Sequence, residues 1–154
     1  MIQSPRLPGR CSDCSLCESA LHGFSEPGHA ASIEGMRRRS ATFAARRILN
    51  YEGDAPKEVF QLFDGWAFRY KVTRDGRRQI LSFILPGDLI DLPLLAVARI
   101  NHAVKALTPI SVCVFDRNQL ADYVYADPLR ARRVGALFAA HLGQADDRML
   151  DLGQ

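Results

Sequence analysis

The hydrophobic positions divide the chain into three parts with different periodicities. From Tyr51 to Asp116, short apolar runs alternate with turn sequences built on glycine, proline and aspartate. After Asp116 the apolar residues recur every three or four positions, which is the period of an α-helix. Residues 1–30 are rich in Pro, Gly, Ser and Cys and have little periodicity, which indicates an irregular segment. The pattern predicts a cysteine-rich segment over 1–30, a β domain over 31–127 and a long helix over 128–154.

Turn signals define the strands of the central part. The pair Asp75-Gly76, flanked by strand-like residues, predicts a hairpin turn, and Pro86-Gly87-Asp88 predicts a second turn. Strands are expected in VFQLFD, WAFRYKVT, RQILSFIL, HAVKALT and ISVCVFD. Closely spaced strands with glycine-rich turns favour an antiparallel sandwich or barrel. Residues 37–50 stay ambiguous, because ATFAARRIL fits a helix whereas MRRRSATF fits a basic strand.

Two helices are expected after the strands. Residues 117–124 predict a short helix, and a long helix begins at Pro128, with proline in its first turn. One apolar stripe of the long helix has alternating spacings of four and three: Phe138, Leu142, Ala145, Met149 and Leu152. This spacing is that of a coiled-coil seam and predicts a homodimer, the alternative being packing on the chain's own barrel. Val134, Leu137 and Ala140 form a second stripe that we expect to face the barrel.

Composition and charge exclude several classes of protein. The 154 residues are 47% hydrophobic and 24% charged with a net charge of +3, as in a globular domain that has a core. This charge is too small to indicate nucleic-acid binding by itself, and clusters such as Arg37-Arg38-Arg39 are more often solvated faces. The chain has no apolar run of membrane-spanning length and no apolar signal core. We therefore expect a cytoplasmic protein without a membrane span.

The most distinctive chemistry lies in CSDCSLC, residues 11–17. Cys11, Cys14 and Cys17 are three of the four cysteines of the chain. In a reducing cytosol, clustered cysteines indicate a metal site or redox thiols rather than structural disulfides. The spacing C-x-x-C-x-x-C delivers three thiolates to one iron–sulfur cubane. Zinc is the main competitor, with His22 or His29 completing a tetrahedron, and a thiol–disulfide switch without any metal is the third interpretation.

No enzymatic class is favoured. A metal-dependent jelly-roll oxygenase needs clustered histidine and carboxylate ligands. The four histidines are scattered and no H-x-H occurs; they are His22, His29, His102 and His141. Neither a nucleophile–base pair nor a phosphate-binding loop is recognisable. We expect no enzymatic activity.

The motifs of residues 60–92 (FQLFDGWAFRYKVTRDGRRQILSFILPGDLIDL) and 104–120 (VKALTPISVCVFDRNQL) resemble the Crp/Fnr superfamily of bacterial transcription regulators. The resemblance extends over roughly residues 40–152. It implies a cyclic-nucleotide-binding-like antiparallel jelly-roll barrel, a short helix and a long dimerisation helix. In that family a C-terminal winged helix-turn-helix domain binds DNA. Gln154 stands where this domain would begin, so we expect a sensor domain without its DNA-binding output.

The resemblance is closest to the Fnr branch, whose members hold an oxygen-labile [4Fe-4S] cluster. They use three N-terminal cysteines and one central cysteine on a barrel strand. This implies Cys11, Cys14, Cys17 and Cys113 as cluster ligands and oxygen or redox state as the signal. The second N-terminal gap is shorter here than in the best-known members. Alternation in SVCVF is equally typical of a cysteine buried as a small apolar residue.

The second implied function is small-ligand sensing. The family's nucleotide pocket binds the cyclic phosphate with an arginine and the ribose with the glutamate of a Gly-Glu pair. Here Asp91-Leu92 replaces Gly-Glu, and Ile100-Asn101 replaces the arginine. A phosphate needs a cation or aimed donors, so we expect no tight binding of cAMP or cGMP. The candidate pocket residues for another ligand are Gly87, Asp88, Asp91, Arg99 and Asn101, and haem ligation by His102 is a minor alternative.

Overall fold

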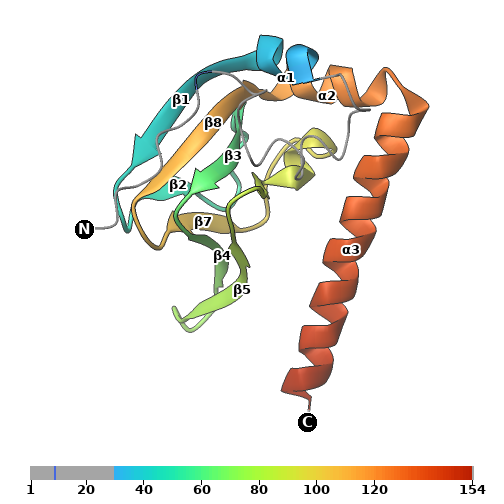
Figure 1. Ribbon diagram of the computed structural model, residues 1–154. Coiled ribbons are helices and arrows are strands. Elements are labelled where there is room, and N and C mark those ends of the chain that lie inside the picture. Colours follow the sequence, from blue (N-terminus) through green and yellow to red (C-terminus); the bar gives the residue numbers. More distant parts are fainter. Residues whose placement is uncertain (1–8, 10–29, 154) are drawn as a thin grey trace.

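The computed structural model describes residue 9 and residues 30–153, and these residues form a β-barrel with helices on one side (Figure 1). The elements are α1 (Ala30–Met36), β1 (Arg37–Phe43), β2 (Ile48–Asn50), β3 (Glu58–Asp64), β4 (Ala67–Val72), β5 (Arg78–Ile84), β6 (Leu89–Ile90), the 3₁₀ helix η3 (Leu92–Leu95), β7 (Ala103–Ala106), β8 (Ile110–Asp116), α2 (Arg117–Tyr125) and α3 (Pro128–Leu152). Two antiparallel four-stranded sheets have the orders β1-β8-β3-β6 and β2-β7-β4-β5. The predicted antiparallel jelly roll, short helix and long helix are confirmed.

Turn chemistry explains the strand boundaries. Gly76 adopts a positive φ of 81° in the hairpin between β4 and β5, and its backbone N–H donates to the Thr73 carbonyl at 2.9 Å. Gly65, after β3, has a φ of 87°, and a Cβ added to it would lie 2.2 Å from the carbonyl oxygen of Pro109. A side chain at this position would therefore clash with backbone as well as strain the turn. The hairpin that Asp75-Gly76 predicts is confirmed.

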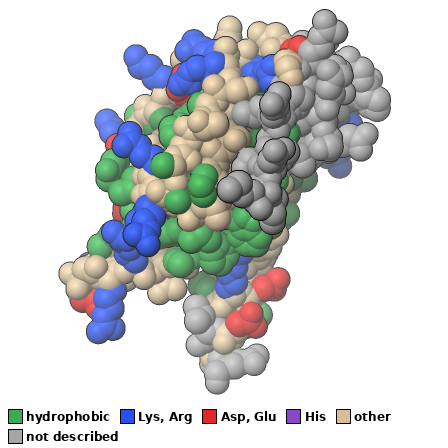
Figure 2. Space-filling model, turned by 60° about the vertical axis from the view of Figure 1, so that its left-hand side comes forward, with side chains coloured by type: hydrophobic (Ala, Val, Ile, Leu, Met, Phe, Trp, Pro, Cys, Tyr) green, Lys and Arg blue, Asp and Glu red, His purple; other side chains and the backbone are tan. Residues whose placement is uncertain are grey.

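The ambiguous segment 37–50 forms strands rather than a helix. Strand β1 pairs with β8, with Ser40 opposite Cys113. Arginines of β1 form ion pairs: Arg38 with Asp116 at 2.6 Å and Arg39 with Glu58 at 2.9 Å. Figure 2 shows Lys and Arg side chains in several separate groups on this face. The arginine cluster thus contributes to strand pairing instead of forming one continuous basic patch.

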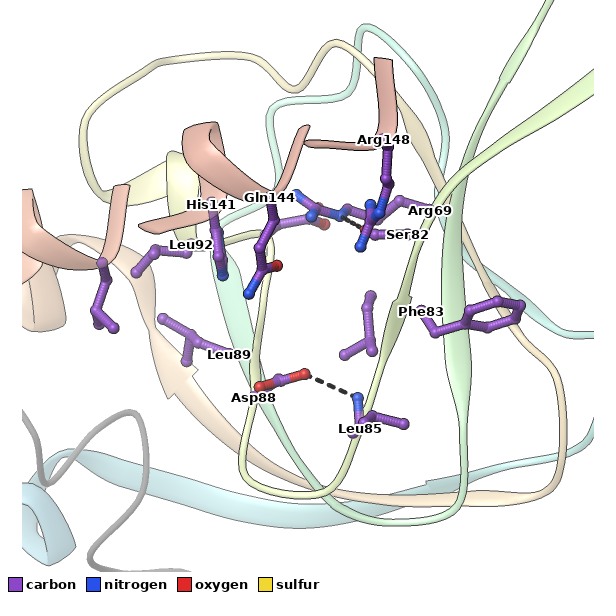
Figure 3. A pocket seen from close by; sticks show the side chains of 13 residues that line it. Arg69, Ser82, Phe83, Leu85, Asp88, Leu89, Leu92, His141, Gln144 and Arg148 are labelled. Atoms are coloured by element: carbon purple, nitrogen blue, oxygen red, sulfur yellow. Dashed lines mark hydrogen bonds between the residues drawn. The ribbon is translucent and has the colours of Figure 1, made fainter. Parts of the chain in front are cut away.

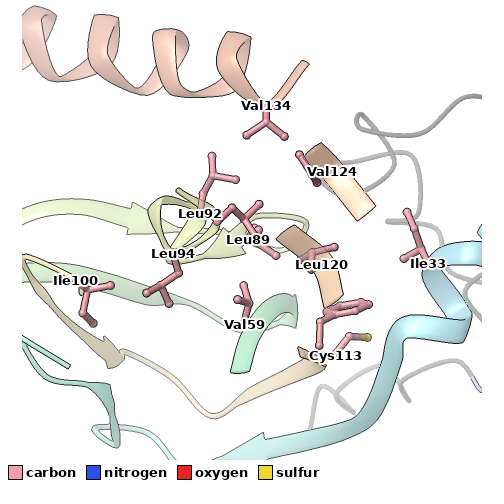
Figure 4. Close-up of a cluster of buried hydrophobic side chains, with 12 residues drawn as sticks. Ile33, Val59, Leu89, Leu92, Leu94, Ile100, Cys113, Leu120, Val124 and Val134 are labelled. Carbon is pink, nitrogen blue, oxygen red and sulfur yellow. The ribbon is translucent and has the colours of Figure 1, made fainter. Parts of the chain in front are cut away.

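Strand β8 separates two hydrophobic cores. Val112 and Val114 belong to one core, inside the barrel, whereas Cys113 and Phe115 belong to the other, on the opposite face of β8. Figure 4 shows Cys113 among the side chains of this second core, where the helices pack. We call the first core the barrel cluster; it comprises Phe60, Leu62, Ala67, Ile84, Ile90, Val104, Ala106, Ile110, Val112 and Val114. The second is the helix-side cluster; it comprises Ile33, Val59, Leu89, Leu92, Leu94, Leu95, Ile100, Cys113, Phe115, Leu120, Val124 and Val134. Because both faces are covered, β8 is almost continuously apolar.

The helices are fixed by caps and by one arginine. The Asp116 carboxylate accepts from the Gln119 backbone N–H at 2.9 Å, and this hydrogen bond, aided by Arg38, lowers the pKa of Asp116. The guanidinium of Arg117, at the start of α2, donates to three carbonyls at and after the end of η3: Leu94 at 2.8 Å, Val97 at 2.8 Å and Ala98 at 3.2 Å. These bonds join α2 to η3.

The long helix α3 begins after Asp127, whose carboxylate accepts from the Leu129 N–H at 2.7 Å, with Pro128 in the first turn. It runs from α2 along the side of the barrel (Figure 1). Val134 is 1% exposed and completes the helix-side cluster, and Leu137 packs beside it. None of the described helices combines the length and the apolar composition needed to span a membrane.

Candidate functional site

A cavity of about 380 Å³ lies between β4, β5 and α3 (Figure 3). Its size is in the range of small-molecule sites. Its polar lining residues are Arg69, Ser82, Asp88, Asp91, His141, Gln144 and Arg148. The other lining residues are apolar, and most of them come from β5, β6 and the start of η3. A small number of polar groups among apolar lining residues is typical of small-molecule sites.

Arg69 and Ser82 form one wall of the cavity. They are opposite each other in the β4–β5 pair, and the Arg69 Nε donates to the Ser82 Oγ at 2.7 Å. Burial lowers the pKa of the Arg69 guanidinium, and Arg148 acts in the same direction, while Asp91 and Asp88 oppose it. An arginine side chain nevertheless stays protonated in proteins. Arg69 is therefore a partly desolvated cation.

The opposite wall comes from α3. Side chains of His141, Gln144 and Arg148 point toward the cavity from successive turns of the helix (Figure 3). Burial lowers the pKa of His141, and the positive charges of Arg69 and Arg148 lower it further, whereas Asp88 raises it. The largest cause of this shift is the burial of the imidazole, and the neighbouring charges contribute less.

A buried polar group lies at the base of the cavity. Asp91 is 2% exposed and His102 is 3% exposed, and the His102 Nε2 lies 2.7 Å from an Asp91 carboxylate oxygen. The side-chain amide of Asn50 donates to the other oxygen, and the His102 Nδ1 lies 3.0 Å from the Asn101 Oδ1. A buried carboxylate is tolerated only with such partners. Both ring nitrogens of His102 are engaged, so this arrangement offers no nitrogen to a haem iron.

The five residues predicted for the pocket do not all lie at the cavity. Asp88 and Asp91 line it. Gly87 is buried in the preceding turn, where its N–H donates to the Leu62 carbonyl at 2.8 Å. Arg99 and Asn101 are exposed, and the Arg99 guanidinium donates to the Gly53 carbonyl at 2.8 Å.

The cations that do line the cavity were not identified from the sequence. Arg69 follows the inward-facing alternation of β4, and this was the only local signal for it. His141 and Arg148 are seven residues apart on α3, so they share one helix face, but only the packing of α3 shows that this face is the one toward the barrel.

The predicted cluster ligands fall into two groups. Cys11, Cys14 and Cys17 lie outside the residues that the structure describes. Cys113 is 7% exposed and belongs to the helix-side cluster, on the same face of β8 as α1. In the described part of the chain, no three His, Cys, Asp or Glu side chains are close enough together to hold a metal ion.

The described residue closest in sequence to the first cysteine is Gly9, and it lies at the start of β1. The Arg37 guanidinium donates to the Gly9 carbonyl. Arg37 is paired with Phe115 of β8, two residues beyond Cys113. Gly9, two residues before Cys11, therefore contacts the first residue of β1, the strand that pairs with β8.

The predicted dimer seam on α3 divides into an inner and an outer part. Phe138 is half-buried and packs against the helix-side cluster. Leu142 and Met149 are each 65% exposed, and Ala145 is exposed as well. The side chain of Leu152 lies outside the described part. Leu150, which was not assigned to the seam, is 67% exposed.

Comparisons with known proteins agree with this architecture. The family model described as "Cyclic nucleotide-binding domain" matches residues 40–127. The nitrogen fixation regulation protein FixK of Bradyrhizobium diazoefficiens is 31% identical over 94% of this chain and 60% of its own length. The transcriptional activator protein FnrL of Cereibacter sphaeroides is 25% identical over 97% of this chain and 59% of its own length. The structure of FixK2 from Bradyrhizobium japonicum aligns with a TM-score of 0.69 and 31% identity, over 75% of this chain and 58% of that chain. The chain thus spans about 60% of the length of these relatives.

Proposed function

This chain belongs to the cyclic nucleotide-binding domain family, in its Crp/Fnr branch, and on that premise we propose that it is the sensory part of a cytoplasmic transcription regulator. The proposed signal is oxygen or redox state, and the proposed cofactor is a [4Fe-4S] cluster held by Cys11, Cys14, Cys17 and Cys113. DNA would be bound by a separate C-terminal domain of the regulator, and the active form would be a homodimer through α3. Regulators of this branch are not enzymes, and no catalytic role is proposed.

The observation that carries the cluster proposal is the position of Gly9 relative to Cys113. The Arg37 guanidinium donates to the Gly9 carbonyl, and Arg37 begins β1, the strand that pairs with the Cys113-containing strand β8. The two steps of chain from Gly9 to Cys11 can span at most about 7 Å. Three thiols of a C-x-x-C-x-x-C run and a fourth thiol on β8 are the donor set that iron–sulfur clusters use.

The surroundings of Cys113 indicate how ligation would affect the fold. Its side chain lies with Ile33 of α1 and Leu120 of α2 in the helix-side cluster. When bound there, the cluster would supply an oxygen-sensitive link between the N-terminal segment and the barrel. Loss of that link would leave Cys113 as an apolar packing residue beneath α1 and α2. Because α2 leads directly into α3, a change of packing at Cys113 would reach the long helix.

The test is reconstitution of the chain with iron and sulfide under anaerobic conditions. We expect wild-type protein to show the visible absorption of a [4Fe-4S] cluster, with one cluster per chain by iron and sulfide analysis. Each change of Cys11, Cys14, Cys17 or Cys113 to alanine is expected to lower occupancy severely. Ser111→Ala, on the same face of the same strand, is the matched control and is expected to keep full occupancy.

Two outcomes would contradict the assignment. A complete, stable cluster in Cys113→Ala would show that the fourth ligand is another residue. Stoichiometric zinc without iron in anaerobically purified protein would replace the cluster by a zinc site, and reversible disulfide formation without metal would replace it by a thiol switch. Circular dichroism of Cys113→Ala separates loss of a ligand from loss of folding.

The second candidate function is small-ligand sensing without a cluster. It is favoured by the cavity between the barrel and α3, whose lining combines charged and apolar side chains. The two candidates are independent, because Cys113 is not among the residues that line the cavity.

A further inference from the structure

We propose that the buried pair of Asp91 and His102 is an internal tether, which holds residues 92–101 closed on the barrel without a bound ligand. We call residues 92–101 the η3 segment; it consists of η3 and the loop that leads to β7. Asp91 is the residue directly before this segment, and His102 is the residue directly after it. The tether goes beyond the proposed function, because it requires neither the iron–sulfur cluster nor a ligand in the cavity.

The pair joins the two ends of the η3 segment at one buried point. The His102 Nε2 lies 2.7 Å from an Asp91 carboxylate oxygen, and the side chains of Asp91 and His102 are 0% and 4% exposed. The amide of Asn50, the last residue of β2, donates to the other carboxylate oxygen. The three side chains thus connect β2 to the residue after β6 and to the residue before β7. A contact of this kind is stronger inside a protein than at its surface, and it is costly to leave half-made there.

The backbone of Asp91 indicates that its side chain is needed at this position. Asp91 has a φ of 62° and a ψ of 45°, in the left-handed region that glycine adopts freely and that costs free energy for a residue with a Cβ. The family resemblance also places Asp91 where the glycine of the Gly-Glu pair is expected. A strained conformation persists only where its surroundings determine it strongly. The buried contacts of the carboxylate supply that compensation.

The η3 segment supplies apolar side chains to the helix-side cluster. Figure 4 shows Leu92, Leu94 and Ile100 among the side chains of this cluster. The backbone of Ile100 is also fixed, because its carbonyl accepts from the Gly53 N–H at 2.9 Å and its N–H donates to the Asp54 carbonyl at 3.0 Å. Opening of the segment would expose the apolar side chains to water, so a tether at both ends of the segment protects this core.

The tether would also determine the position of α2. The guanidinium of Arg117 donates to three carbonyls that all belong to the η3 segment, those of Leu94, Val97 and Ala98. Because α2 leads directly into α3, a segment held closed by Asp91 and His102 would fix the start of the long helix from within the chain. The closed position of the η3 segment would thus be the resting state of the domain and not a state that a ligand induces.

The experiment is hydrogen exchange on the 154-residue chain without added ligand, measured by mass spectrometry on peptides that cover residues 92–101. We expect the η3 segment of wild-type protein to be protected. Asp91→Asn keeps the shape of the side chain and tolerates the left-handed backbone, but it removes the charge. Asp91→Asn and His102→Gln are each expected to speed exchange in this segment about tenfold or more, since a buried hydrogen bond to a charged group is lost. Lys71→Gln, which removes an exposed ion pair with Glu52, is the matched control and should leave the exchange unchanged.

The double variant distinguishes a tether from two independent packing residues. If Asp91 and His102 act through one contact, the protein with both changes exchanges no faster than the faster single variant, whereas independent residues would give multiplied effects. Coupling to α2 is measured in the Arg117→Gln background. There, Asp91→Asn is expected to cause no additional increase of exchange in residues 117–125.

The ring of His102 gives a second measurement, on wild-type protein alone. Its Nε2–H proton is expected to be visible by ¹⁵N-edited NMR, because burial and the hydrogen bond to Asp91 protect it from exchange with water. Circular dichroism verifies that the variants fold. Unchanged exchange in β3 and β8 of the variants would show that the opening is local to the η3 segment.

Three results would overturn the proposal. These are unchanged protection of residues 92–101 in either folded single variant, multiplied effects in the double variant, and rapid exchange of the η3 segment or of the His102 Nε2–H in wild-type protein. Failure of wild-type protein to take up a cluster would refute the oxygen-sensing proposal and leave these results untouched.

Discussion

The two halves of α3 have the same helical period, but the first half buries its apolar side chains against the barrel and the second half leaves them exposed. In the first half, residues 128–140, Val134 is buried and Leu137 and Phe138 pack against the helix-side cluster. In the second half, residues 141–152, the apolar side chains of Leu142 and Met149 are mostly exposed. The side of the second half that faces the barrel carries polar groups instead.

This difference indicates that contacts within the chain hold the first half of α3 on the barrel more firmly than the second half. Burial of apolar area in the first half contributes about 25 cal/mol per Å² toward holding it on the barrel. The second half is joined to the barrel by polar contacts, among them the hydrogen bond from Arg148 to the Leu81 carbonyl. Such contacts contribute less than apolar burial, and an exposed apolar stripe is typical of a surface that a partner covers.

The largest effect is expected from a charge placed in the first half. Val134→Asp would put a carboxylate without a partner into the helix-side cluster, and we expect the free energy of unfolding to fall by about 3–5 kcal/mol. Chemical denaturation followed by circular dichroism measures this. Val72→Asp is the control, because Val72 is 55% exposed on the β4–β5 hairpin, and its effect is expected within about 0.5 kcal/mol. Equal losses in both variants would show that Val134 is not a packing residue.

A smaller effect, on association rather than folding, is expected from the second half. We expect the chain without its cluster to dimerise at micromolar concentration, because no charged residue lies in the predicted seam. Leu142→Glu is expected to raise the dimer dissociation constant about tenfold to a hundredfold, since burying a leucine contributes about 1.5–3 kcal/mol. Asp147→Asn, on the opposite face of the helix, should have little effect. Sedimentation equilibrium decides: a wild-type monomer at tens of micromolar would mean that α3 is not a self-sufficient seam.

The smallest effect is expected from cyclic nucleotides. Asp91 is committed to its buried contacts with His102 and Asn50, and no arginine stands at Ile100-Asn101. Calorimetry with cAMP and cGMP is therefore expected to give no measurable heat of tight binding. A low-micromolar dissociation constant for either nucleotide would contradict this assignment of the pocket.

Local signals in the sequence predict most of the fold. Asp75-Gly76 predicts its hairpin because the positive φ of a tight turn depends on the turn residues themselves. Segment 37–50 stayed ambiguous because β1 is stabilised by pairing with β8, about seventy residues away, and such pairing has no local signature. Strand β6 and helix η3 were not predicted, since LIDLPLL is too short and too apolar to show either period.

The candidate sites were less predictable than the fold. The turn motif and the family resemblance identified Asp88 and Asp91, but a cavity between β4 and α3 depends on how distant elements pack. Arg69 and Arg148 are 79 positions apart in the sequence, so no spacing rule connects them. The pairing of Asp91 with His102 was equally inaccessible, because burial of a charged residue depends on a partner supplied by the tertiary structure.

The three hydrogen bonds from Arg117 give the molecule a mechanical property. They link η3 to α2, so a displacement of Asp91, the residue before η3, would be passed on to α2 and from there to the start of α3. The 25 residues of α3 make a rod about 37 Å long. A tilt of about 5° at its first turn moves its last turn by about 3 Å, from the same rise per residue. A small change in the angle of α3 near Arg117 would thus displace the far end of the helix by about the distance between two atoms in contact.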